Sequence, residues 1–67
     1  MDIDNNQTIK RRLISIKQAG VYLSRSEWTV GEMIRSGRLP YVRDNRRKFV
    51  DILDLEKWIE INKTRSE

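Results

Sequence analysis

The chain contains neither cysteine nor histidine. This absence excludes disulfide bridges, zinc fingers, iron–sulfur centres, cysteine nucleophiles and imidazole bases, so we expect no metal site and no cofactor. No apolar run approaches the roughly 20 residues that span a bilayer, so we expect no membrane partner. A chain of 67 residues forms one domain at most, and its fold has to rest on packing alone.

Basic residues outnumber acidic ones, 14 against 10, which gives a net charge of +4. Their distribution is more informative than their sum. The basic residues gather at positions 10–12 and again at Arg35, Arg38, Arg43, Arg46, Arg47 and Lys48, and the acidic ones gather at Asp51, Asp54, Glu56 and Glu60. Charges that only keep a small domain soluble are one explanation, but they do not account for three consecutive cations at residues 46–48. The pattern favours an anionic partner.

Residues 1–12 show no periodicity and are predicted to form a flexible N-terminal tail. The basic residues at the end of this tail are either solvated or in contact with phosphates. The N-terminus is polar and acidic, unlike a signal peptide, so we expect a cytoplasmic protein. We place the folded domain at residues 13–62 and expect residues 63–67 to fray.

The folded domain begins with Leu13 and Ile14, which form a short apolar segment or a brief strand. Ser15 then opens a first helix, because a serine followed three residues later by glutamine is a capping box. The apolar and small residues of this helix recur at helical spacing and predict its buried stripe, namely Ile16, Ala19, Gly20 and Leu23. The small pair of alanine and glycine indicates that another helix crosses closely there.

A second helix is predicted within residues 23–40, LSRSEWTVGEMIRSGRLP. Ser26 is a good N-cap, Gly37 supplies the left-handed residue past the helix end, and Pro40 prevents a restart. Val30, Met33 and Ile34 fall on one side, and the residues away from this stripe are Trp28, Thr29, Gly31, Glu32 and Arg35. Two short helices joined by so few residues fit a helix-turn-helix.

The remaining third of the chain predicts a β-hairpin and a last helix. Residues 41–43 and 48–50 flank Asp44 and Asn45, which both tolerate left-handed turn conformations. Phe49, with Val42 or Tyr41, is expected on the buried side of this hairpin. Asp51 begins the last helix, whose inward face is predicted from spacing as Ile52, Leu55, Trp58 and Ile59.

This order of elements resembles the small winged-helix DNA-binding domains of the excisionase family, which are related to the MerR-type domain. The matching features are Ala19, Gly20 and Leu23 in the first helix, the turn and helix start at residues 26–30, the run Gly37, Leu39 and Pro40, the basic wing at residues 43–48, and the closing pattern at residues 54–58. The resemblance covers about residues 13–60 and implies an α+β fold of three helices and a two-stranded wing. Arg25 and Asn45 depart from the family pattern, which usually has an apolar residue and a glycine at these positions.

The candidate DNA contacts lie on the second helix and on the wing. On the helix they are Ser26, Trp28, Thr29, Glu32 and Arg35, and on the wing they are Arg43, Arg46, Arg47 and Lys48. An α-helix fits the major groove, where threonine can contact a thymine methyl, glutamate can accept from cytosine and arginine can bind guanine. The alternative is an ordinary solvent-exposed face. Trp28 either packs in part against the fold or stands against the DNA backbone, and Gly31 indicates a close approach of DNA or of another helix.

We therefore expect a sequence-specific protein that binds double-stranded DNA. The resemblance implies an excisionase, which binds and bends DNA beside a recombination site, often in several neighbouring copies, so that an integrase carries out excision of a mobile element. A small phage or plasmid transcriptional regulator on the same fold is the alternative. A protein-interaction module that uses the acidic last helix is the alternative of another class. We expect no enzyme, because so short a chain has little room for a substrate cleft, and we expect a monomer in solution.

Overall fold

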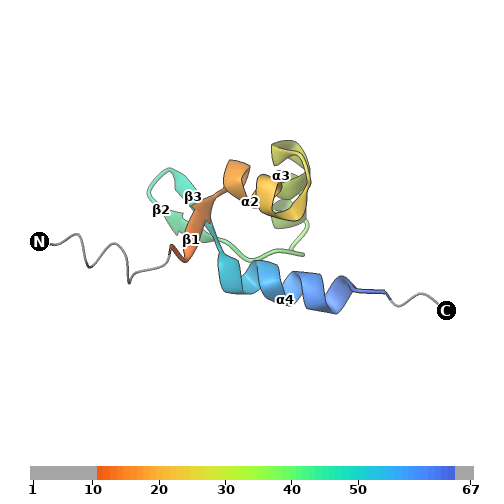
Figure 1. The fold of residues 1–67 in the computed structure, drawn as a ribbon. Coiled ribbons are helices and arrows are strands. Elements are labelled where there is room, and N and C mark those ends of the chain that lie inside the picture. Colours follow the sequence, from red (N-terminus) through yellow and green to blue (C-terminus); the bar gives the residue numbers. More distant parts are fainter. Residues whose placement is uncertain (1–10, 65–67) are drawn as a thin grey trace, which may run out of the picture.

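A computed structural model describes residues 11–64, so residues 1–10 of the tail predicted over residues 1–12, and the end of the chain at 65–67, lie outside the described residues. The elements are β1 (Leu13–Ser15), α2 (Ile16–Leu23), α3 (Glu27–Arg35), β2 (Val42–Asp44), β3 (Arg47–Asp51) and α4 (Ile52–Asn62). Figure 1 shows α4 beneath the other elements, with the β2–β3 hairpin towards one end and α3 towards the other. The predicted α+β winged helix-turn-helix fold is confirmed, with one more strand than expected.

The additional strand is β1, which makes the sheet three-stranded and antiparallel in the order β1-β3-β2. Its pairing places Ile14 opposite Val50, and both side chains are buried. Successive side chains of a strand point to opposite faces, so Phe49 lies on the other face of the sheet and is only half-buried. The prediction that Phe49, with Val42 or Tyr41, forms the buried side of the hairpin is therefore wrong.

All three helices begin at the residues that the sequence indicates. Ser15 forms the complete capping box with Gln18, the side chain of Ser26 accepts from the backbone N–H of Thr29, and that of Asp51 accepts from Leu53. The chain leaves α3 through Gly37, whose φ of 81° lies in the left-handed region that glycine adopts without a steric cost. These local signals fix where the helices begin and where α3 ends.

The core is one cluster to which every element except β2 contributes. Its buried members are Ile14, Ala19, Val30, Met33, Ile34, Leu39, Val50 and Leu55, and Ile16, Leu23, Ile52 and Trp58 pack against it. The predicted inner faces of α2 and α3 are thus confirmed, and that of α4 is confirmed for Ile52, Leu55 and Trp58, whereas Ile59 is only half-buried and lies outside the cluster. Because the hairpin tip adds nothing to this cluster, it projects beyond the core into solvent. No helix within residues 11–64 is long and apolar enough to cross a membrane.

Gly20 is the point of closest approach between α2 and the turn that precedes α3. A Cβ atom at Gly20 would lie 2.7 Å from the carbonyl oxygen of Arg25, and the N–H of Arg25 donates to the Gly20 oxygen at 2.8 Å. The sequence indicated that another helix crosses here, and the structure places the backbone of the turn leading into that helix at this point. Glycine at this position therefore allows α3 to start close against α2.

Arg12 belongs to the folded part of the chain, although the sequence interpretation assigned it to the tail. Its Nη2 lies 2.8 Å from Oδ2 of Asp51, and its carbonyl oxygen accepts from the N–H of Ile52 at 2.8 Å. The Arg12 guanidinium, with the backbone N–H of Leu53, holds the pKa of Asp51 below its usual range. One carboxylate thus both caps α4 and fixes the start of β1.

Two glycines inside helices provide a matched test of the close approach. Gly20→Ala should lower the free energy of unfolding by about 1–3 kcal/mol, because the new methyl group collides with backbone. Gly31→Ala should raise it by about 0.5–1 kcal/mol, because a Cβ there meets only the Arg35 side chain at 3.7 Å and alanine is the better helix former. Urea denaturation measures both values, and a Gly20→Ala variant as stable as the original protein contradicts the argument.

The lowered pKa of Asp51 predicts a pH dependence. A carboxyl group whose pKa is lower in the folded state stabilises the fold above its unfolded pKa of about 3.9, and this contribution is lost as the pH falls through the folded value. Asp51→Asn keeps a good N-cap but removes the charge. The variant should therefore be less stable than the original protein at pH 7, with a difference that shrinks below pH 4. Urea midpoints at both pH values measure it, and a constant difference contradicts this role.

Candidate nucleic-acid interface

The outer face of α3 is free of contacts with the core. Val30, Met33 and Ile34 point inward, so Trp28 and Arg35, seven residues apart, lie on the opposite side with Gly31 and Glu32 between them. Trp28 is 70% exposed, more than the other aromatic side chains of the chain. Most of the indole is therefore not covered by the fold and is available to a partner.

The two hydroxyl residues of the candidate set serve the helix start. The Oγ atom of Ser26 accepts from the N–H of Thr29 at 3.0 Å and lies 2.8 Å from the Thr29 Oγ1 atom. Thr29 is half-buried, whereas Ser26 is exposed. These two hydroxyl groups therefore serve first to cap α3, and a ligand can contact them only at the N-terminal end of the helix.

Glu32 and Arg35 are brought together as an ion pair on the outer face. The Nε atom of Arg35 donates to Oε2 of Glu32 at 3.1 Å, and a terminal guanidinium nitrogen forms a salt bridge with the same oxygen. An exposed pair of this kind adds at most about 1 kcal/mol of stability. Its main consequence is geometric, because Glu32 holds the guanidinium against the helix above Gly31.

The wing is the hairpin of β2 and β3, and its four candidate residues are exposed. Asp44 pairs with Arg47 and Arg43 pairs with Lys48, so the turn residues are Asn45 and Arg46. Asn45 adopts a φ of 58°, which asparagine tolerates, and its carbonyl oxygen accepts from Nε of Arg43 at 3.2 Å. The turn lies one residue later than the Asp44–Asn45 pair that the sequence indicated.

The basic side chains surround the tip of the wing on both faces. Arg43 and Lys48 are opposite each other and share one face, Arg47 lies on the other face, and Arg46 is in the turn. Lys48 Nζ also lies 5.5 Å from the centroid of the Tyr41 ring, within the range of a cation–π contact. The cations thus project in several directions from a narrow hairpin.

Arg25 is a candidate contact that sequence reasoning missed. It lies in the turn directly before α3 and is exposed. Its position in the sequence could have indicated such a contact, because residues at the start of a recognition helix lie near the DNA backbone. The resemblance had marked Arg25 only as a departure from an apolar position.

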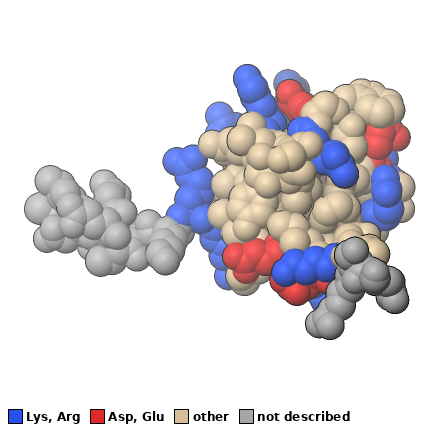
Figure 2. Space-filling view, turned by 45° about the vertical axis from the view of Figure 1, so that its right-hand side comes forward, with Lys and Arg blue, Asp and Glu red and all other residues tan. Residues whose placement is uncertain are grey.

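Charge is distributed unevenly over the molecule. Residues 25–48 contain seven basic and three acidic residues, whereas residues 51–63 contain four acidic and two basic ones. In the view of Figure 2, Lys and Arg atoms surround a broad uncharged surface, and Asp and Glu atoms lie at the lower edge and, in smaller groups, at the top and the right-hand side. The part that contains α3 and the wing is therefore the basic part, and α4 is the acidic one.

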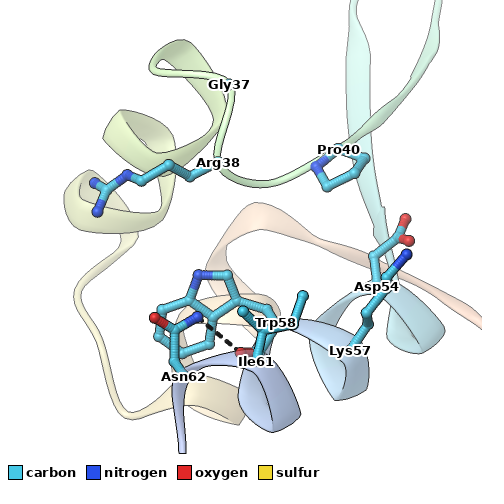
Figure 3. A pocket seen from close by; sticks show the side chains of 8 residues that line it. All are labelled: Gly37, Arg38, Pro40, Asp54, Lys57, Trp58, Ile61 and Asn62. Carbon is cyan, nitrogen blue, oxygen red and sulfur yellow. Dashed lines mark hydrogen bonds between the residues drawn. The ribbon is translucent and has the colours of Figure 1, made fainter.

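A shallow groove of about 420 Å³ lies between the segment after α3 and the helix α4. Figure 3 shows its lining residues, Gly37, Arg38, Pro40, Asp54, Lys57, Trp58, Ile61 and Asn62. The Trp58 side chain faces the segment above it, and Asn62 Nδ2 donates to the Trp58 carbonyl oxygen at 2.8 Å. Within residues 11–64 no group of three or more acidic side chains is placed to hold a metal ion.

Comparison with known proteins identified no relative of this chain. No protein-family model, curated protein or solved structure matches this chain. The proposed function therefore rests on the geometry of α3 and the wing.

Proposed function

We propose that this protein binds double-stranded DNA in a sequence-specific manner, with α3 in the major groove and the wing on the adjacent phosphate backbone. The observation that carries the proposal is the set of four exposed cations around the wing tip, Arg43, Arg46, Arg47 and Lys48. Like charges crowded on one narrow hairpin repel each other, and an anionic partner removes that cost.

The arrangement of these cations favours a groove over a flat anionic surface. Arg47 faces one way and the pair of Arg43 and Lys48 faces the other, so a hairpin tip between two phosphate strands has basic side chains toward both. The minor groove beside the recognition helix presents such a pair of strands. Contacts of this kind give affinity and orientation and carry little sequence information.

Sequence readout is assigned to the outer face of α3. Arg35 has guanidinium donors on an exposed side chain, and arginine bound to the O6 and N7 atoms of guanine is the commonest specific contact in the major groove. Glu32 already pairs with Arg35, so we assign it to positioning this arginine in place of the contact with cytosine that the sequence suggested. Trp28 stands at the start of the helix, where its exposed ring can contact sugar or base.

The resemblance over residues 13–60 leads us to propose an excisionase role. The buried residues of all three helices belong to one small core, and the aliphatic side chains left exposed on α2 and α4 are Val21, Leu53 and Ile61, which supports a monomer over a symmetric dimer with a large apolar interface. Such a monomer suits direct, closely spaced sites beside a recombination site, where neighbouring copies bend the DNA for an integrase. Bending costs on the order of 1–6 kcal/mol for 20–30 base pairs, and contacts from several copies offset it.

Charge removal on the wing tests the binding model. Arg47→Ala should weaken binding to all duplex sequences to a similar degree and make the salt dependence shallower by roughly one unit in the log–log slope. Lys57→Ala removes the same charge from α4 and is the matched control, for which we expect no change in slope. Fluorescence anisotropy at several salt concentrations gives both quantities.

A variant of α3 distinguishes contacts that orient the protein on DNA from contacts that read the base sequence. Arg35→Ala should cost about 1–3 kcal/mol on the preferred site and much less on random duplex. Equal losses on both duplexes would remove Arg35 from sequence recognition. An unchanged affinity and slope for Arg47→Ala would remove the wing from the interface, and a protein without salt-sensitive binding to DNA would instead be an interaction module.

The excisionase role predicts the shape of the complex. On circularly permuted fragments that carry the preferred site, added protein should give successive complexes whose mobility depends on the position of the site, because several monomers bend the DNA. One straight complex of a preformed dimer on a palindrome would contradict this role and favour the transcriptional regulator.

A further inference from the structure

Gly31 is a glycine that the fold itself does not require. It lies inside α3, and the glycine with a positive φ within the described residues is Gly37, so Gly31 has an ordinary helical backbone. A Cβ atom at Gly31 would meet only the terminal nitrogens of Arg35, at 3.7 and 3.8 Å, which is ordinary contact. Alanine would make a more stable helix at this position. Nothing within residues 11–64 therefore requires a glycine here, and its position on the outer face of α3 suits the close approach of a partner.

The missing side chain leaves a notch on the face that we assign to the major groove. The Arg35 guanidinium, held by Glu32, borders this notch, and Trp28 stands one turn earlier on the same face. The notch has the size of a methyl group and is bordered by aliphatic backbone carbon and a planar cation. Among the groups that bases present in the major groove, the apolar one is the 5-methyl group of thymine.

We propose that Gly31 accommodates the 5-methyl group of a thymine that lies directly 5′ to a guanine bound by Arg35. This inference rests on the proposed function. In a 5′-TG step the methyl group and the guanine O6 and N7 atoms are neighbours on the same groove edge. A guanidinium that binds the guanine therefore lies beside the methyl group, and a Cβ atom at residue 31 would occupy the same space. Glu32 acts as a positioning residue that keeps the guanidinium in this plane.

The test begins with duplexes enriched from a random 25-base-pair pool by the original protein. Each thymine of the enriched site is then replaced, one at a time, by deoxyuridine, which lacks only the methyl group. Replacement of the thymine in the TG step should weaken binding about fourfold, as expected for the burial of one methyl-sized group. The other thymines of the same duplex are the internal controls and should change binding little.

The Gly31→Ala variant should reverse this preference. Its new methyl group competes with that of thymine, so the variant should bind the thymine duplex more weakly than the original protein and should prefer the deoxyuridine duplex. A thermal midpoint equal to or above that of the original protein shows that the variant is folded. The same comparison with 5-methylcytosine and cytosine at this position should repeat the pattern.

The outcomes separate this inference from the proposed function. No enrichment over non-specific duplex would overturn sequence-specific binding itself. Enrichment without a deoxyuridine-sensitive thymine next to guanine would overturn the role of Gly31 and leave the DNA-binding function intact. A Gly31→Ala variant that keeps the original preference for thymine would have the same meaning.

Discussion

The backbone of the turn before α3 lies against Gly20, and this contact sets how the candidate interface is presented. With the Arg25 oxygen 2.7 Å from the place of a Cβ atom, α3 starts close beside α2. This start directs Val30, Met33 and Ile34 into the core, so the opposite face of a nine-residue helix is left for a partner. A larger residue at Gly20 would move the turn and, with it, every side chain on that face.

The small core stabilises the fold, and the wing projects beyond it into solvent. Eight buried side chains from β1, the three helices, β3 and the segment after α3 form this core, and β2 adds none. Of the two wing strands only β3 reaches the core, through the fully buried Val50, and the chain enters β2 from the buried Leu39. A hairpin held at its base and charged at its tip is suited to contacts with a polyanion, because cations that neutralise phosphates release the counterions condensed on the nucleic acid.

Features that depend on neighbours in the chain could be predicted from the sequence. The caps at Ser15, Ser26 and Asp51, and the left-handed Gly37, follow from local hydrogen bonding and backbone preference. The pairing of β1 with β3 could not be derived, because the short segment at Leu13 carries no information about its partner strand. The face that Phe49 occupies depends on the same register. The Arg12–Asp51 ion pair spans 39 positions and had no local signal. Spacing along the helix predicted which residues lie away from the buried stripe of α3. It could not show that Glu32 pairs with Arg35 or that Trp28 is exposed, because both depend on how the side chains are arranged.

The central claim is that the outer face of α3 and the wing tip, which lie towards opposite ends of the molecule (Figure 1), both contact DNA while α4 faces away. A titration of the isotope-labelled protein with a duplex of about 20 base pairs, followed by backbone amide chemical shifts, tests it most directly. We expect the changes to concentrate at residues 25–35 and 43–48 and to leave residues 53–62 nearly unchanged. Changes concentrated along α4 and the groove around Trp58, or no changes at all, would contradict the account.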